Sequence, residues 1–154
     1  MGMNLESYLK KNNVWFKFIQ KPGTIHTADA AKVTGIDLKR ITKNLICKTS
    51  EGEYAILIIP GDKRVNLKEA AEILKTQNIY LVPFDKAEEI SGYPPGGTPS
   101  VGHKTRMRAI IDKSILVYET VYCGGGTRDE ILELRTEDIL KLNDATIGEI
   151  VHRP

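Results

Sequence analysis

One segment of the chain is apolar at consecutive positions, and this restricts the folds that are open to it. In "EYAILII", Glu53 to Ile59, apolar residues stand on both parities from Tyr54 onward. A strand with one solvated face alternates apolar and polar residues, whereas a strand covered on both faces does not. The segment is therefore predicted to be a central strand, which Pro60 to Asp62 ends.

Helical and extended patterns alternate irregularly along the rest of the chain. Helices are expected near residues 5–9, 28–34, 66–74, 84–90 and 137–143, and extended segments near 14–19, 79–82, 108–112, 115–122 and 131–134. The expected N-caps are Asn4, Thr27, Asn66 and Thr136, and Gly35 and Gly92 stand where helices often end on glycine. This order predicts an α/β (α+β) fold, a compact single domain over residues 1–154 with a mixed, strongly bent β-sheet flanked by helices.

The composition is that of a globular protein and narrows the possible functions. Hydrophobic residues make up 41% and charged residues 27% of the chain, which is too apolar for a disordered protein. The formal net charge is only +2, so a nucleic-acid site would need local clusters of Lys and Arg. The sequence has no signal peptide and no apolar run approaching about 18 residues, so we expect a cytoplasmic protein without a membrane segment.

Cysteine and histidine residues form no metal-binding pattern in the sequence. Cys47 and Cys123 belong to no C-x-x-C pair, and His26, His103 and His152 are scattered. Metal ligands in short motifs recur at close spacing. We therefore expect no metal, no cofactor and no disulfide framework.

A loop rich in glycine and proline, "GYPPGGTPSVGH" from Gly92 to His103, lies between two regular segments. Proline fixes φ and glycine reaches φ values closed to other residues, so the loop is predicted to follow a defined and unusual path. Gly96 and Gly97 carry no Cβ, so a ligand could approach their amides, as at anion sites built from backbone N–H groups. The alternative is a purely structural connection.

Lys43, in "ITKNLICKT", has two interpretations. If residues 41–49 form a strand, Lys43 shares a face with Leu45 and Cys47, and its ammonium then needs a partner or a ligand in apolar surroundings. If "LKRITKNL" instead forms a helical turn, Lys43 lies in water. Lys43 is therefore a candidate site residue whose role depends on the local structure.

A basic segment, "HKTRMR", follows the glycine loop. In an extended conformation Lys104, Arg106 and Arg108 fall on one face at period two, which suits a row of phosphates. Lys63 and Arg64 add another cationic pair at the end of an expected element. The alternative is a solvated strand edge, where lysine and arginine are common.

No nucleophile motif is present in the sequence. Ser100 and His103 could imitate a Ser–His pair, but no acid that would orient the histidine stands near them. Gly124 to Gly126 could cradle a phosphate, but no G-K-[ST] follows, and a tight connection between strands is the preferred explanation.

Five motifs, in this order, resemble the YbaK/prolyl-tRNA synthetase editing-domain family. They are "HTADAA" at 26–31, "ITKNLI" at 41–46, "IIPGDKRVN" at 58–66, "GYPPGGTPSVGH" at 92–103 and the turn "CGGGTRD" at 123–129. The resemblance extends from about Thr27 to Leu142. It implies a compact mixed α/β domain that hydrolyses the ester of a mischarged aminoacyl-tRNA carrying a small amino acid, here as a free-standing protein.

The resemblance also implies roles for individual residues. Lys43 matches the lysine that meets the 3′-terminal adenosine of the tRNA, and Gly96 matches the glycine of a G-x-x-x-P loop whose backbone amide holds the scissile carbonyl. Ser100 fills the proline position of that motif, one residue after Pro99. The expected catalytic residues are Lys43, Gly96 and Gly97, the expected substrate contacts are Thr27, Asn44, Ser100, His103 and Gly125, and the expected tRNA contacts are Lys63, Arg64, Lys104, Arg106 and Arg108.

The missing nucleophile agrees with this chemistry. An aminoacyl ester is already activated, so an enzyme needs a placed water, a polarised carbonyl and a held adenosine end; in the family the ribose hydroxyl of the substrate assists the water. The leading hypothesis is a trans-editing deacylase whose partners are the acceptor end of tRNA and a synthetase. The alternatives are a non-catalytic module that binds the acceptor end or a synthetase, and a hydrolase of small esters.

Overall fold

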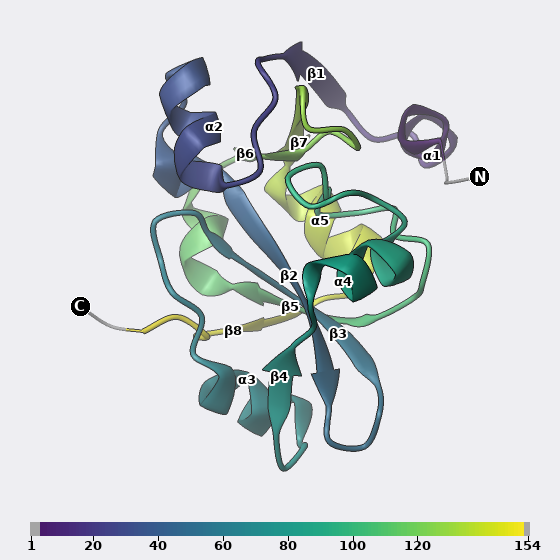
Figure 1. The fold of residues 1–154 in the computed structure, drawn as a ribbon, viewed down its shortest axis with the longest axis vertical. Helices are drawn as coiled ribbons and strands as arrows, with labels where there is room; N and C mark the ends of the chain where they lie inside the picture. Colours follow the sequence, from purple (N-terminus) through teal and green to yellow (C-terminus); the bar gives the residue numbers. More distant parts are fainter. Residues whose placement is uncertain (1–3, 153–154) are drawn as a thin grey trace.

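Residues 4–152 are described in the computed structural model, and their strands form two sheets (Figure 1). The larger sheet has the order β4-β2-β3-β5-β8. β3 (Tyr54–Pro60) lies at its centre, antiparallel to β2 (Thr42–Thr49) and parallel to β5 (Arg108–Asp112). β4 (Ile79–Leu81) and β8 (Thr146–Gly148) form the edges. The sheet is therefore mixed, as the sequence predicts.

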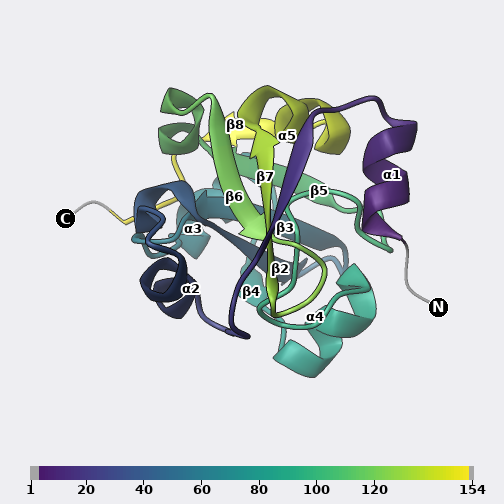
Figure 2. The ribbon, with the colours of Figure 1, turned by 90° about the horizontal axis from the view of Figure 1, so that it is seen from above.

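The smaller sheet is antiparallel and has the order β1-β7-β6. Its strands are β1 (Phe16–Gln20), β7 (Glu130–Arg135) and β6 (Thr120–Gly124). Figure 2 shows this sheet lying over the larger one, and the core between them joins residues of β3 to residues of β7 and β6. The mixed α/β class is confirmed, but the strands divide between two sheets instead of sharing one bent sheet.

Five α-helices and two short 3₁₀ turns complete the described residues. The helices are α1 (Leu5–Lys11), α2 (Thr27–Thr34), α3 (Leu67–Leu74), α4 (Phe84–Ser91) and α5 (Thr136–Asn143), and the turns are η1 (Leu38–Arg40) and η2 (Lys113–Val117). Within residues 4–152, none of these helices combines the length and the apolar character that a membrane crossing requires.

β3 is buried on both faces, which confirms the prediction made from its consecutive apolar residues. Ile56 and Ile58 pack into the core shared with the smaller sheet and α5. Leu57 and Ile59 pack on the opposite face against α3. All four side chains are fully buried, so each face of the larger sheet needs its own covering layer.

Most expected helix ends are confirmed. Asn4 and Asn66 cap α1 and α3, each accepting a hydrogen bond from the backbone amide three residues later. Gly35 and Gly92 end α2 and α4 in the left-handed conformation, with φ of 74° and 87°. These positions follow from local hydrogen bonding and backbone freedom, which short sequence patterns encode.

Two expected N-caps and one expected segment are wrong. Thr27 and Thr136 are the first residues of their helices, and the cap positions belong to His26 and Arg135. The Thr136 hydroxyl instead donates to the carbonyl of Tyr118 at 2.7 Å, so it ties α5 to the end of η2, just before β6. Residues 115–122 divide between η2 and β6 instead of forming one extended segment.

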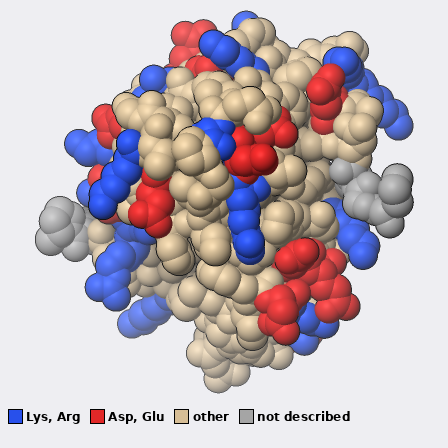
Figure 3. Space-filling model, turned by 45° about the horizontal axis from the view of Figure 1, so that its top comes forward, with Lys and Arg blue, Asp and Glu red and all other residues tan. Residues whose placement is uncertain are grey.

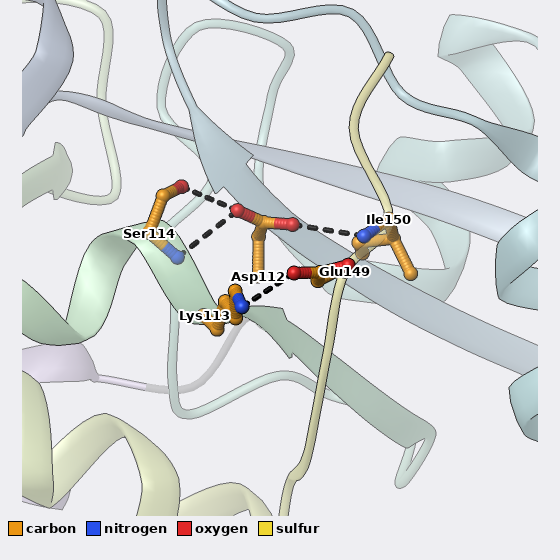
Figure 4. Close-up of polar contacts among 5 residues, drawn as sticks. All are labelled: Asp112, Lys113, Ser114, Glu149 and Ile150. Carbon is orange, nitrogen blue, oxygen red and sulfur yellow. Dashed lines mark hydrogen bonds and ion pairs between the residues drawn. The ribbon is translucent and has the colours of Figure 1, made fainter. Parts of the chain in front are cut away.

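A buried carboxylate, Asp112, joins the end of β5 to the chain after β8 (Figure 4). One of its oxygens accepts from the backbone amide and hydroxyl of Ser114 at the start of η2. The other oxygen accepts from the amide of Ile150 at 2.8 Å. Lys113 and Glu149, on either side, form an exposed ion pair. Asp112 therefore fixes η2 and the C-terminal segment at the same point.

Replacing Asp112 with Ala should lower the free energy of unfolding by about 1–3 kcal/mol, because the buried amide of Ile150 loses its acceptor. Lys113→Ala, which breaks only the exposed ion pair, should change it by less than about 1 kcal/mol. Urea unfolding of the two variants beside the parent protein measures both effects. Equal midpoints for Asp112→Ala and the parent would contradict the anchoring role.

Candidate functional site

A cavity of about 390 Å³ opens between four parts of the chain. The start of β2, from Ile41 to Ile46, forms its floor, and residues of the 21–30 segment form one wall. β4 and α4 supply a second wall, and the glycine loop at 95–98 closes the space beside Gly124 of β6. Gly61 adds a residue of the 58–66 segment, so the cavity combines residues from all five motifs that the sequence singles out.

Lys43 lies in β2 opposite Ile59 of β3, so the strand interpretation is confirmed and the helical one is wrong. The helical turn that precedes it, η1, ends at Arg40. Lys43 is half-buried and lines the cavity. Its Nζ donates one hydrogen bond, to the carbonyl of Lys63 at 3.0 Å, and it forms no ion pair with any described residue. The ammonium keeps two hydrogens for a ligand.

Asn44, next to Lys43, is held in the cavity wall by a hydroxyl network. The Ser100 hydroxyl donates to Asn44 Oδ1 at 2.6 Å, and Asn44 Nδ2 donates to the carbonyl of Thr98 at 3.3 Å. The Thr42 hydroxyl lies 3.0 Å from that of Ser100. Ser100 is fully buried and does not line the cavity, so it orients Asn44 and is not placed to touch a ligand directly.

Gly96 lines the cavity and has the left-handed φ of +86°. A Cβ at Gly96 would lie 2.5 Å from the carbonyl oxygen of Thr24 and 2.7 Å from Cα of Ile25. The position therefore needs glycine because another backbone segment lies against it, and not because a ligand needs the space. Its amide donates to no other residue within 4–152, so it is available to a ligand.

Gly97 does not offer a second free amide. Its N–H donates to the carbonyl of Pro94 at 2.9 Å, and its carbonyl accepts from Gly126 at 2.8 Å. A Cβ there would lie 2.9 Å from the backbone of Thr127. The expectation that a ligand meets both glycine amides is therefore wrong for Gly97, and Gly96 remains the candidate.

Gly96→Ala should lower the free energy of unfolding by at least about 1–2 kcal/mol, which is the usual penalty for a side chain in the left-handed region. The clash with Thr24 adds to it. Gly23→Ala is the matched control, because no atom lies within 4 Å of the added Cβ and φ is not positive. Chemical denaturation compares the variants; similar losses at both positions would show that the Thr24 contact does not constrain the loop.

Of the other expected substrate contacts, some line the cavity and some do not. Thr27 lines the cavity. His103 does not: its Nε2 donates to the carbonyl of Pro99 at 2.8 Å, and burial lowers its pKa, so the neutral ring braces the loop. The Ser100 hydroxyl donates to Asn44 and the His103 ring to Pro99, and no hydrogen bond joins Ser100 to His103 within residues 4–152. Gly125 also lies outside the lining, and its amide donates to Glu130 at 3.0 Å in the turn between β6 and β7.

The expected tRNA contacts are exposed, apart from the half-buried Lys63, but they are not collected on one strand. β5 begins only at Arg108, whose guanidinium donates to the carbonyl of Leu74 in α3 at 2.9 Å. Arg106 donates to the carbonyl of Leu142 in α5 at 3.4 Å, and Lys104 precedes it in the loop. Because α3 and α5 cover opposite faces of the larger sheet, these cations diverge.

Lys63 and Arg64 lie in the connection between β3 and α3, outside the cavity lining, although the Lys63 carbonyl holds Lys43. Figure 3 shows basic and acidic side chains interspersed on the drawn face. A continuous basic surface is therefore absent from that face.

Two parts of the cavity were missed by sequence reasoning. Lys21 lines it and is only 9% exposed, although nothing in "QKPGT" marks it as buried. The wall formed by α4 presents Phe84, Ala87 and Glu88, and among residues 4–152 no other acidic residue lines the cavity. Their spacing of three and four residues is the signal that could have indicated a shared helix face.

Cys123, which also lines the cavity, is not a nucleophile in this environment. Burial raises the pKa of its thiol to about 11, so it is protonated at neutral pH. The described lining therefore offers the Lys43 ammonium, backbone amides without a partner such as that of Gly96, and the Asn44 side-chain amide that Ser100 holds, but no activated nucleophile.

Comparison with known proteins agrees with this arrangement. Residues 21–142 match the family described as the aminoacyl-tRNA editing domain. A relative from Enterococcus faecalis, named as a Cys-tRNA(Pro)/Cys-tRNA(Cys) deacylase, is 24% identical over 135 residues, which cover 88% of this chain and 82% of the relative. The proline–tRNA ligase of Thermosipho melanesiensis is 26% identical over 109 residues, which cover 71% of this chain and 19% of the ligase.

Solved structures share the fold. One, described as a hypothetical protein, has a TM-score of 0.89 and 26% identity and covers 96% of this chain and 99% of its own. Another, described as a trans-editing enzyme for prolyl-tRNA synthetase, has a TM-score of 0.86 and 23% identity and covers 97% of this chain and 95% of its own. With its motifs, its cavity and a family match over most of its length, the chain belongs to the aminoacyl-tRNA editing domain family.

Proposed function

We propose that this protein is a deacylase that hydrolyses the ester of mischarged aminoacyl-tRNA. The observation that carries the proposal is the cavity in which Lys43, an ammonium with two unused hydrogens and no carboxylate partner, shares the lining with the free amide of Gly96. A cation suits the 3′-terminal nucleotide, and a free amide suits a developing oxyanion. Membership of the editing family supports the same reaction.

In the proposed reaction, Lys43 holds the terminal adenosine end and the Gly96 N–H donates a hydrogen bond to the ester carbonyl oxygen. A water, assisted by the free hydroxyl of the terminal ribose, attacks the carbonyl carbon. The bond between that carbon and the ribose oxygen then breaks, and the amino acid and the uncharged tRNA leave. Loss of one preorganised donor of this kind lowers the catalytic rate about 10²–10³-fold.

The size and charge of the cavity support a small amino acid as the group removed. Its volume of about 390 Å³ is near the lower end of the usual range for ligand sites, roughly 300–1,000 Å³. The name of the Enterococcus faecalis relative refers to cysteine, whose side chain is small. Glu88, as the acidic residue of the lining, is suited to the α-ammonium of the aminoacyl group.

A panel of purified aminoacyl-tRNAs tests this proposal against its alternatives. Loss of the ester from tRNAs carrying small amino acids is expected, with far slower loss from free aminoacyl esters. Binding of tRNA without loss of any ester would instead favour a non-catalytic module that binds the acceptor end or a synthetase. Equal rates on tRNA and on free esters would favour a hydrolase of small molecules.

Lys43→Ala should lose most deacylation and keep its circular dichroism and melting temperature nearly unchanged. The residue gives up one hydrogen bond at a half-exposed site, whereas the substrate loses the contact that positions it, and misplacement costs about a hundredfold in rate. Lys48→Ala, on the same strand but outside the cavity lining, is the matched control. Full activity of Lys43→Ala would remove Lys43 from the mechanism.

Affinity for tRNA should fall as salt rises, because phosphate contacts release counterions. Replacing Lys104, Arg106 and Arg108 together with Ala should weaken binding and reduce the slope of log affinity against log salt by about 0.9 for each phosphate contact removed. Filter binding at several salt concentrations measures the slope. An unchanged slope would assign these exposed cations to ordinary solvated surface.

A further inference from the structure

Lys21 is a buried cation with no role in the proposed reaction so far. It is 9% exposed and forms no ion pair with a described residue. Its Nζ donates to the Thr24 hydroxyl at 2.7 Å, to the carbonyl of Pro22 at 3.3 Å and to the carbonyl of Arg128. Burial lowers its pKa, and the charge of Asp129 opposes that shift. A buried ammonium of this kind is tolerated only because its hydrogens are bonded.

The two lysines of the cavity therefore differ in what they can offer a ligand. An ammonium has three hydrogens to donate. Lys43 uses one of them inside the protein, whereas Lys21 uses all three. A ligand could recruit Lys43 without breaking the structure, but it could recruit Lys21 only by displacing an internal acceptor. Lys21 is thus placed to hold the protein and not the substrate.

The acceptors of Lys21 belong to two segments that are far apart in the sequence. Pro22 and Thr24 lie just before α2, and Arg128 lies in the turn between β6 and β7. Two backbone hydrogen bonds join the same segments. The Thr24 amide donates to the carbonyl of Arg128 at 3.0 Å, and the Lys21 amide donates to the carbonyl of Asp129 at 2.9 Å. The ammonium therefore closes a junction between the 21–25 segment and the 125–129 turn.

Both segments of this junction lie directly against the glycine loop. Thr24 and Ile25 occupy the space where a Cβ of Gly96 would be. From the other segment, Arg128 Nε donates to the carbonyl of Pro95 at 2.8 Å, and Thr127 lies against Gly97. A shift of either segment would therefore move the backbone that carries the free Gly96 amide.

We propose that Lys21 is a positioning residue, whose ammonium locks the 21–25 segment to the 125–129 turn and so aims the Gly96 amide at the ester carbonyl. The inference rests on the proposed deacylase function and adds to it a residue that acts without touching the substrate. A residue that acts in this way affects the transition state, where the oxyanion forms, more than it affects binding of the tRNA.

Lys21→Met tests the inference, because it keeps the length and apolar stem of the side chain and removes the three donors. On a tRNA substrate that the parent protein deacylates, kcat should fall about tenfold to a hundredfold, with KM within about twofold of the parent value. Lys17→Met, an exposed lysine of β1 outside this cavity, is the matched control and should keep the parent kcat.

A second readout does not depend on activity. In ¹⁵N-labelled protein, hydrogen exchange should become faster in Lys21→Met than in the parent at two bonded amides: that of Thr24, which donates to Arg128, and that of Gly97, which donates to Pro94. Exchange at amides of the buried strand β3 should stay unchanged. Hydrogen exchange can be measured even if the protein cleaves no substrate. Failure of the deacylase proposal can therefore be told apart from failure of the positioning proposal.

Two outcomes would overturn the inference. Parent values of kcat and of exchange at the Thr24 and Gly97 amides in Lys21→Met would show that the junction does not position the loop. A raised KM with unchanged kcat would show that Lys21 binds the substrate instead. If Lys21→Met does not fold, Thr24→Val removes one acceptor of the ammonium and leaves Lys21 in place. This variant should lower kcat by a smaller factor and leave KM unchanged. A parent kcat in Thr24→Val would also reject the proposal.

Discussion

Burial of β3 on both faces is the constraint on which the rest of the structure depends. Its consecutive apolar side chains are removed from water only if a layer covers each face of the strand. One layer is α3, and the other is the smaller sheet together with α5. β2 lies beside β3 in a fixed register, with Lys43 opposite Ile59. A one-residue slip of that register would turn Lys43 to the opposite face. Hydrophobic burial in one strand thus fixes the cation of the neighbouring strand.

The site itself is built from close contacts between backbone segments. Gly96 lies against Thr24 and Ile25, Gly97 lies against Thr127, and Gly124 lies against Gly97 and Thr98. The 92–103 loop and the 123–129 turn both need glycine, because the backbone segments touch at distances that leave no room for a Cβ. An amide held by packed backbone does not need to reorganise as charge develops, which is what an oxyanion site requires.

Much of the fold and part of the site could be predicted from the sequence. Apolar periodicity identified β3 and local capping identified the ends of α1 and α4, whereas Lys43 had two interpretations, of which the strand is correct. The hydroxyl of Ser100 and the ring of His103 were expected at the substrate, but each is bonded to another part of the chain. Arg106 and Arg108 were expected on one face because they are two positions apart, yet their guanidinium groups bond carbonyls on opposite faces of the larger sheet. Sequence spacing places a residue on its own element and does not show which distant group it meets.

The sequence by itself determined the elements whose causes are local: the doubly buried strand, the glycine and asparagine helix ends, the unusual path of the glycine loop, and the family that its motifs resemble. Only the tertiary structure decided that Gly96, and not Gly97, has a free amide, and that Lys21 is buried while Lys43 keeps two hydrogens for a ligand. The physical reason is that a hydrogen bond or a contact between residues more than a hundred positions apart, such as Lys21 with Arg128, depends on how all the intervening elements pack.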